Sequence, residues 1–295
     1  MYENYFEKLH DECYLRNRTQ NTADAYIRNI ESFLMYTGKH PEELTLDDAR
    51  NYLIDKKKAN VSAATCNYYH SSLRFFYKFV LGKEWDGDYV PRMRREYHQP
   101  EVLTLDEVER LIDTAREPRN KALIALIYSS GLRVSEAINL APDDIYMSTM
   151  QVHVRESKNH SDRWTILSKR ALDLLIDYWH SCSFPREKLF VSTLAPYAPL
   201  QKSGAEIVIR QIAKEAGITK RVYPHLLRHS FATHLLEQGV SLEYIQSLLG
   251  HRSPNSTCVY LHLTNKSMMG IQNPLDHPKK KKRGRPKKNG GGQNV

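Results

Sequence analysis

The sequence Gly131-Leu-Arg-Val-Ser-Glu136 follows an apolar segment that has helical periodicity. A glycine at this place predicts the end of a helix, because glycine adopts the left-handed conformation of a helix C-cap without strain. Upstream, Thr104 and Glu107 have the spacing of a capping box and predict the first turn of another helix. A helical domain is therefore expected to begin near residue 101.

Two short strands are predicted downstream of this helical part. Gln151-Val-His-Val-Arg155 alternates apolar and polar residues, Asn159-His-Ser-Asp162 predicts a turn, and Trp164-Thr-Ile-Leu167 forms the returning strand. The pattern is helical again to about residue 272. Residues 101–275 are thus expected to form a mixed, mostly helical domain around a small antiparallel sheet.

Residues 1–85 are expected to form a separate helical bundle, so that the fold class is mainly α. Apolar residues recur at helical spacing from Tyr26 to Leu34, and Thr45 and Ser62 suit the N-caps of two later helices. A chain of 295 residues is long enough for two domains.

Residues 86–100 separate the two predicted domains. They contain turn residues and three arginines, Arg92, Arg94 and Arg95, but no apolar period. This pattern is typical of an interdomain linker.

The net charge of +9 is concentrated near the C-terminal end of the sequence. Residues 279–288 contain eight lysines and arginines and no acid, which leaves a net charge of +1 for the rest. Bulk charge therefore gives no argument that the folded part binds nucleic acid. Any such argument has to come from particular residues.

The composition excludes several classes of protein. With 41% hydrophobic and 26% charged residues, the chain resembles an ordinary soluble globular protein. No apolar run approaches the ~20 residues that span a bilayer, and the first residues lack the pattern of a secretory signal. The four cysteines stand singly, without the spacing of a zinc site or a disulfide framework. We expect a cytoplasmic protein that does not bind membranes.

The second domain contains the residues with the clearest chemical meaning. The sequence has no phosphate-binding G-x-x-x-x-G-K-[ST] loop, no H-E-x-x-H and no acidic cluster for two metal ions. It does have a spaced set of basic residues that precedes a tyrosine. The set is Arg133, Lys158 at the hairpin turn, His225 and Arg228 one helical turn apart, His251 and Tyr260.

Each of these residues alone has a simpler structural interpretation. Arg133 could pair with Glu136 one turn later, Lys158 could be a solvated lysine of the hairpin, and Tyr260 is one of 18 tyrosines. It is the joint occurrence of the set that favours a functional site.

A histidine metal site is the competing interpretation of the same helix. His225, His229 and His234 include an i, i+4 pair, which is a common ligand spacing. Arg228 on the same face would repel a cation, and no cysteine joins the group. His229 and His234 are therefore interpreted as structural.

Four elements of this set resemble the tyrosine recombinase family, in particular Xer-type recombinases and phage or mobile-element integrases. The elements are the G-L-R-V-S-E box, the H-L-L-R-H box, the L-G-H element and the tyrosine of T-C-V-Y-L-H, and they occur in the family's order and spacing. The resemblance runs from near the N-terminus to about residue 272. It implies a SAM-like core-binding domain followed by a catalytic domain.

The resemblance also implies the chemistry of the site. Tyr260 would attack the scissile phosphorus and form a 3′-phosphotyrosine, with His225 helping to remove its proton. Lys158 would protonate the departing 5′-oxygen. Arg133 and Arg228 would bind the non-bridging oxygens, because guanidinium forks suit phosphate, and His251 would donate one more hydrogen bond. Neither a metal nor ATP is expected as a cofactor.

The expected partner is double-stranded DNA at two recombination sites. The resemblance implies a homo-tetramer on DNA that passes through a Holliday junction, with residues 265–271 contacting a neighbouring copy. The two domains would clamp the duplex, with Arg92, Arg94 and Arg95 on the DNA. An accessory DNA-binding protein and association with the nucleoid are further expectations.

Four functions fit these observations to different degrees. A recombinase or integrase of a mobile element is favoured, because the basic tail is not part of the Xer pattern. Xer-type resolution of chromosome or plasmid dimers is the nearest alternative. A non-catalytic architectural protein conflicts with the intact set of site residues, and a type IB topoisomerase conflicts with the compact helical N-terminal domain.

The tail, residues 276–295, contains Lys282-Arg-Gly-Arg-Pro-Lys-Lys288, which resembles an AT-hook. In that motif Arg283 and Arg285 would enter the narrow minor groove of A·T-rich DNA. The alternatives are a disordered basic tail that binds phosphate without preference and, in a eukaryotic source, a nuclear localisation signal.

Overall fold

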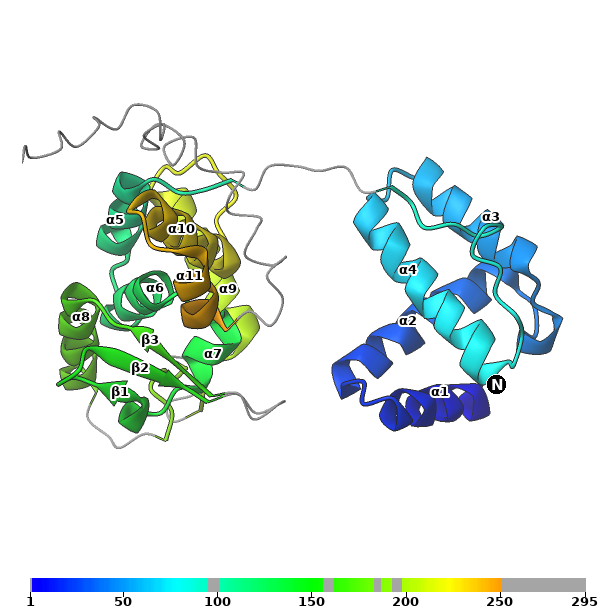
Figure 1. Ribbon diagram of the computed structural model, residues 1–295, viewed down its shortest axis with the longest axis horizontal. Helices are drawn as coiled ribbons and strands as arrows, with labels where there is room; N and C mark the ends of the chain where they lie inside the picture. The colour runs from blue at the N-terminus through cyan, green and yellow to red at the C-terminus, as the bar shows by residue number, and fades with distance from the viewer. Residues whose placement is uncertain (1, 95–100, 156–161, 183–186, 193–197, 251–295) are drawn as a thin grey trace, which may run out of the picture. The chain divides into compact units, whose positions relative to one another are not determined.

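The structure is a computed structural model that describes residues 2–94, 101–155, 162–182, 187–192 and 198–250. The chain divides into two compact units, Met1–His98 and Gln99–Val295 (Figure 1). Lys158, His251, Tyr260, Arg95, Arg283 and Arg285 lie outside the described residues. No described helix is long and apolar enough to cross a membrane.

The first unit is built from helices, as the sequence predicts. They are α1 (Glu3–Leu15), α2 (Gln20–Thr37), α3 (Leu46–Lys58) and α4 (Ala63–Phe75), with a 3-10 turn at Pro41–Glu43 and a π-helical turn at Phe76–Val80. Thr45 closes a capping box with Asp48 and begins α3, and the hydroxyl of Ser62 caps α4. Gly38 ends α2 in the left-handed conformation.

The first part of the predicted linker, residues 86–94, lies against this unit. Val90 is buried in the unit's core, and its carbonyl oxygen is 2.9 Å from Nε2 of His70. The side chain of Asn67 makes two hydrogen bonds of 2.8 Å with the backbone of Met93. One buried valine without a periodic pattern around it gives too weak a signal to predict this packing from sequence.

The second unit is a mixed domain, as predicted. Its helices are α5 (Leu105–Thr114), α6 (Pro118–Ser130), α7 (Val134–Asn139), α8 (Lys169–His180), α9 (Lys202–Glu215), α10 (Pro224–Glu237) and α11 (Leu242–Leu249) (Figure 1). Helix α6 packs against α8 and α10, and its residues 122–127 are all buried. It is the centre of a core that belongs to this unit alone.

The antiparallel sheet has the order β1-β2-β3, with strands Ile145–Tyr146, Gln151–Val154 and Arg163–Ile166. The two predicted strands are β2 and β3, and β1 was not predicted because two residues show no alternation. Val152 pairs with Thr165 on the inward face, and the Thr165 hydroxyl donates to the carbonyl oxygen of Ser130 at 2.8 Å. This bond ties β3 to the end of α6.

Gly131 ends α6 in the left-handed conformation, with φ of +61°. A Cβ atom built there would be 2.5 Å from the ring of Phe231 and 2.8 Å from Leu249. Both the backbone conformation and the close packing therefore require glycine. The same turn brings the Gly131 carbonyl oxygen within 2.9 Å of Nη1 of Arg228 on α10.

Candidate active site

Arg133 occupies the N-cap of α7, two residues after the glycine turn. Its backbone N–H donates to Oε2 of Glu136 at 2.7 Å, and its Nη1 donates to Oε1 of the same carboxylate at 2.5 Å. The side chain remains 35% exposed. The local ion pair with Glu136, the simpler interpretation of Arg133, is thus present, yet it leaves part of the side chain accessible.

Arg228 lies on α10 and is fully buried, at 0% exposure. Its Nη1 donates to the carbonyl oxygen of Gly131 at 2.9 Å, and its Nη2 donates to the carbonyl oxygen of Leu249 at 2.7 Å. Nη1 is also 3.5 Å from Oε2 of Glu136. The arginine joins the ends of α6 and α11 beside the same carboxylate.

Arg163, the first residue of β3, is the third arginine on Glu136. Its Nη2 and Nη1 lie 2.7 and 3.0 Å from the two carboxylate oxygens, and its Nε donates to the carbonyl oxygen of Leu248 at 2.9 Å. Both Glu136 and Arg163 are about nine-tenths buried, with side-chain exposures of 10% and 9%. Three guanidinium groups therefore converge on one carboxylate.

The carboxylate of Glu136 is held in its charged form. Burial alone would raise its pKa, but the hydrogen bonds and charge of Arg163, the backbone N–H of Arg133 and the charge of Arg228 lower it. The charges of the three guanidinium groups and one carboxylate sum to two positive charges. Such a cluster is suited to bind an anion, and phosphate oxygens match the guanidinium geometry.

His225 lies in the first turn of α10, on the helix that contains Arg228. Desolvation lowers its pKa, and the nearby positive charges of Arg228 and Arg133 lower it further, although the imidazole reaches the surface. A neutral imidazole has a nitrogen that can accept a proton. This state is the one that a general base requires.

His229 and His234 have structural surroundings. The His229 ring packs edge-on against that of His225, with centroids 4.5 Å apart, and its pKa is lowered to about 4 by desolvation and by the charges of His225 and Arg228. Nδ1 of His234 is 2.7 Å from the hydroxyl of Tyr128. Within the described ranges, no group of three or more His, Cys, Asp or Glu side chains is arranged to hold a metal ion.

The neutral histidines predict that stability falls on acidification. The unfolded chain protonates His229 near its ordinary pKa of about 6.5, whereas the folded chain does so only near the lowered value of about 4. The free energy of unfolding should thus be greatest above pH ~6.5 and decrease toward pH ~4, with His225 and His234 acting in the same direction.

Urea unfolding at about pH 7.5 and about pH 5 measures this change, and His229→Gln should show a smaller difference than the unmodified chain. His180→Gln, at an exposed position of α8, is the matched control and should retain the full difference. A His229→Gln chain with the same pH dependence as the control would contradict the prediction.

The structure thus brings together Arg133, His225 and Arg228 from the predicted set. The sequence indicates Glu136 only as an ion-pair partner of Arg133 and indicates no role for Arg163. The strand pattern gives no signal for Arg163. The apolar residues Trp164 and Ile166 favour burial of the opposite face, yet the structure leaves both exposed. Arg92 and Arg94 are exposed in the first unit, where Nη2 of Arg92 donates to Ser71 Oγ at 2.6 Å.

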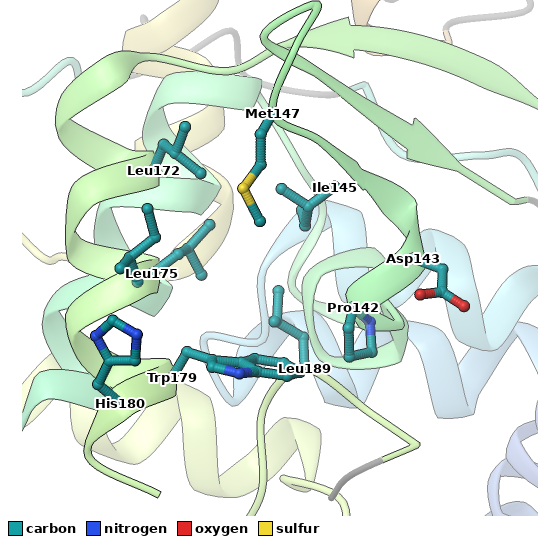
Figure 2. A pocket seen from close by; sticks show the side chains of 10 residues that line it. Pro142, Asp143, Ile145, Met147, Leu172, Leu175, Trp179, His180 and Leu189 are labelled. Atoms are coloured by element: carbon teal, nitrogen blue, oxygen red, sulfur yellow. The ribbon is translucent and has the colours of Figure 1, made fainter.

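A pocket of about 500 Å³ lies elsewhere on the second unit (Figure 2). Leu172, Leu175 and Trp179 of α8 face Ile145 and Met147 across it. Its lining is mostly apolar and includes none of the arginines on Glu136. The arginine cluster, and not this pocket, has the chemistry of an anion site.

Comparisons with known proteins show the family of this chain. Residues 101–267 match the phage integrase family, and residues 5–87 match the phage integrase N-terminal SAM-like domain. The tyrosine recombinase XerD of Oceanobacillus iheyensis is 32% identical over 281 residues, which cover 89% of this chain and 93% of that protein. The tyrosine recombinase XerC of Listeria welshimeri is 29% identical over 287 residues, covering 90% of this chain and 94% of that protein.

Solved structures show the same fold. The XerA recombinase crystal structure has a TM-score of 0.54 and 29% identity, covering 90% of this chain and 96% of that chain. The Tn1549 transposon integrase in complex with transposon right end DNA has a TM-score of 0.70 and 17% identity. The match covers 87% of this chain and 94% of that chain. The chain belongs to the phage integrase family. It is a site-specific tyrosine recombinase.

Proposed function

We propose that this recombinase cuts and rejoins DNA through a covalent 3′-phosphotyrosine at Tyr260 and passes through a Holliday junction. The observation that supports this most is the convergence of Arg133, Arg163 and Arg228 on Glu136, which leaves an excess of positive charge beside His225. A scissile phosphate is the anion that such a recombinase must bind. Residues 101–275 would form the catalytic domain.

The bond changes assign a role to each site residue. The Tyr260 oxygen forms a bond to phosphorus as the bond from phosphorus to the 5′-oxygen breaks. His225 accepts the tyrosine proton, and Lys158 gives a proton to the departing 5′-oxygen. Arg133 and Arg228 stabilise the charge on the non-bridging oxygens, and His251 donates a further hydrogen bond. The phosphoester bond is exchanged rather than hydrolysed, so neither metal nor ATP has a role in these steps.

The DNA would be a duplex carrying two recombination sites bound by a homo-tetramer. Structures similar to this chain include XerH bound to palindromic difH substrate and a lambda integrase dimer bound to a core site. The helical domain of residues 1–85 would hold one side of the duplex, and Arg92, Arg94 and Arg95 would contact phosphates. An accessory DNA-binding protein remains part of this proposal.

Mobility of a genetic element is the biological role that we favour. The fold matches a transposon integrase, and the basic tail would add affinity for the element's DNA. Xer-type dimer resolution is the second candidate, because XerD and XerC relatives cover almost the whole chain.

Covalent trapping tests the proposed chemistry. The full chain is incubated with EDTA and labelled DNA from the region flanking its own gene, and the complex is denatured with detergent. A labelled adduct is expected, and peptide mapping should locate the phosphotyrosine at residue 260. Intact binding to these DNAs without any adduct would overturn the cleavage reaction and favour an architectural role.

The tail makes a separate prediction. Replacing Arg283 and Arg285 by alanine should weaken binding to A·T-rich flanks by on the order of tenfold, and binding to G·C-rich flanks much less. Competition binding at fixed salt concentration measures the two affinities. The double substitution Lys287→Ala with Lys288→Ala removes the same charge outside the R-G-R-P core and is the matched control. Equal losses on both kinds of DNA would favour the non-selective basic tail.

A further inference from the structure

Arg163 is a buried arginine that the proposed reaction does not use. It is the first residue of β3, and each nitrogen of its guanidinium group has a hydrogen-bond acceptor. Two nitrogens face Glu136, and the third faces the carbonyl oxygen of Leu248. Burial of a charge is costly unless it is paired, so the position of Arg163 is determined by these partners.

The C-terminal end of α11 fixes the orientation of the Arg163 side chain. The last carbonyl groups of a helix lack partners within the helix and attract positive charge. Here Leu248 accepts from Arg163, and Leu249 accepts from Arg228. Gly250, with φ of +64°, leaves room for this contact, because a Cβ atom there would be 2.8 Å from Cδ of Arg163.

Arg163 is also the arginine whose guanidinium group engages Glu136 most fully. It places both terminal nitrogens on the two carboxylate oxygens, at 2.7 and 3.0 Å. Arg133 and Arg228 each contribute one terminal nitrogen, at 2.5 and 3.5 Å. A two-point arginine–carboxylate pair is stronger and more directional than a one-point pair. Arg163 can therefore neutralise Glu136 while the other two arginines keep their positive charge for another anion.

The charges explain why this matters for cleavage. A phosphodiester has one negative charge, and the pentacoordinate state formed by attack on phosphorus has a second. Arg133 and Arg228 supply two positive charges only if Glu136 is neutralised by a third group. Without Arg163 the carboxylate would cancel part of the charge that the phosphate needs.

We infer that Arg163 is a positioning residue for strand cleavage, which neutralises Glu136 so that Arg133 and Arg228 keep their charge and orientation for the scissile phosphate. This inference rests on the proposed cleavage reaction and adds a residue to it. In this role Arg163 acts through Glu136 and not on the reacting atoms.

A double-substitution cycle tests this role. Arg163→Gln should lower the single-turnover cleavage rate, measured per bound DNA complex, by about a hundredfold, while the Kd for DNA changes by less than about threefold. In a Glu136→Gln background the same substitution should lower the rate by less than about threefold, because no carboxylate then needs neutralising. Arg170→Gln, an exposed arginine paired with Glu109 and Asp113, is the control and should cleave normally.

The rate per bound complex does not depend on the folded fraction, so a loss of stability alone cannot produce this pattern. If Arg163→Gln fails to fold, the comparison of Glu136→Gln with the double variant still decides. The role of Arg163 is overturned if the double variant cleaves about tenfold or more slowly than Glu136→Gln. It is also overturned if Arg163→Gln lowers the cleavage rate equally in the wild-type and Glu136→Gln backgrounds. In both cases the cleavage reaction of the wild-type chain stands. A wild-type chain that forms no Tyr260 adduct overturns the cleavage reaction and this role with it.

Discussion

Replacing Tyr260 by phenylalanine is expected to abolish strand cleavage while DNA affinity stays within about threefold of wild type. Phenylalanine keeps the ring and loses only the oxygen that would bond to phosphorus. The DNA contacts come from other groups, so binding should persist. The measurements are detergent-resistant adduct formation and the Kd on the same labelled DNA.

The control for this prediction is another tyrosine. Tyr244 is an exposed residue of α11, and Tyr244→Phe should cleave at the wild-type rate. Equal loss of binding and cleavage in Tyr260→Phe would mean that the hydroxyl has a structural role. Residual adduct formation in Tyr260→Phe would show that another residue is the nucleophile.

Replacing Arg228 by alanine is expected to lower the free energy of unfolding by about 3–5 kcal/mol, the range for breaking a buried ion pair by removing one partner. The guanidinium has no exposure to solvent, and its loss leaves the carbonyl oxygens of Gly131 and Leu249 without these donors. It also removes one positive charge from Glu136. Urea unfolding measures the change in stability.

Arg228→Lys tests the geometry of the guanidinium fork while the positive charge is kept. It keeps the charge but cannot span Gly131 and Leu249 as the two-nitrogen fork does, so cleavage per bound complex should fall by on the order of a hundredfold. The control is Arg170→Ala, whose exposed ion pairs should contribute at most about 1 kcal/mol. An Arg228→Ala chain as stable as Arg170→Ala would contradict the buried network.

The helix boundaries could be predicted because their causes are local. The capping boxes of Thr45 and Thr104 and the glycine turn at Gly131 each depend on residues within one turn of helix. The fold class and the family followed from periodicity and from short boxes that keep their spacing. Strand β1 and the packing of Val90 depend on contacts that no local pattern encodes.

The contacts within the candidate site could be predicted only in part. The residues Arg133, His225 and Arg228 follow from their boxes, but the burial of Arg228 depends on a carbonyl 97 residues away. Arg163 on β3 reaches Glu136 on α7, which lies 27 residues earlier in the chain. A basic residue beside a hairpin is usually solvated, so only the tertiary structure distinguishes Arg163 from its neighbours.

Each unit of this chain closes a core made of its own residues, one around Phe33 and Tyr52, the other around helix α6. Substitutions in one core therefore leave the packing of the other unchanged, and the two can accumulate sequence changes at different rates. If the helical unit holds one side of the duplex as proposed and reads bases there, a lineage can acquire new insertion sites without rebuilding its catalytic chemistry. Exchange of whole N-terminal units between relatives would then be a direct route to recombinases with altered targets.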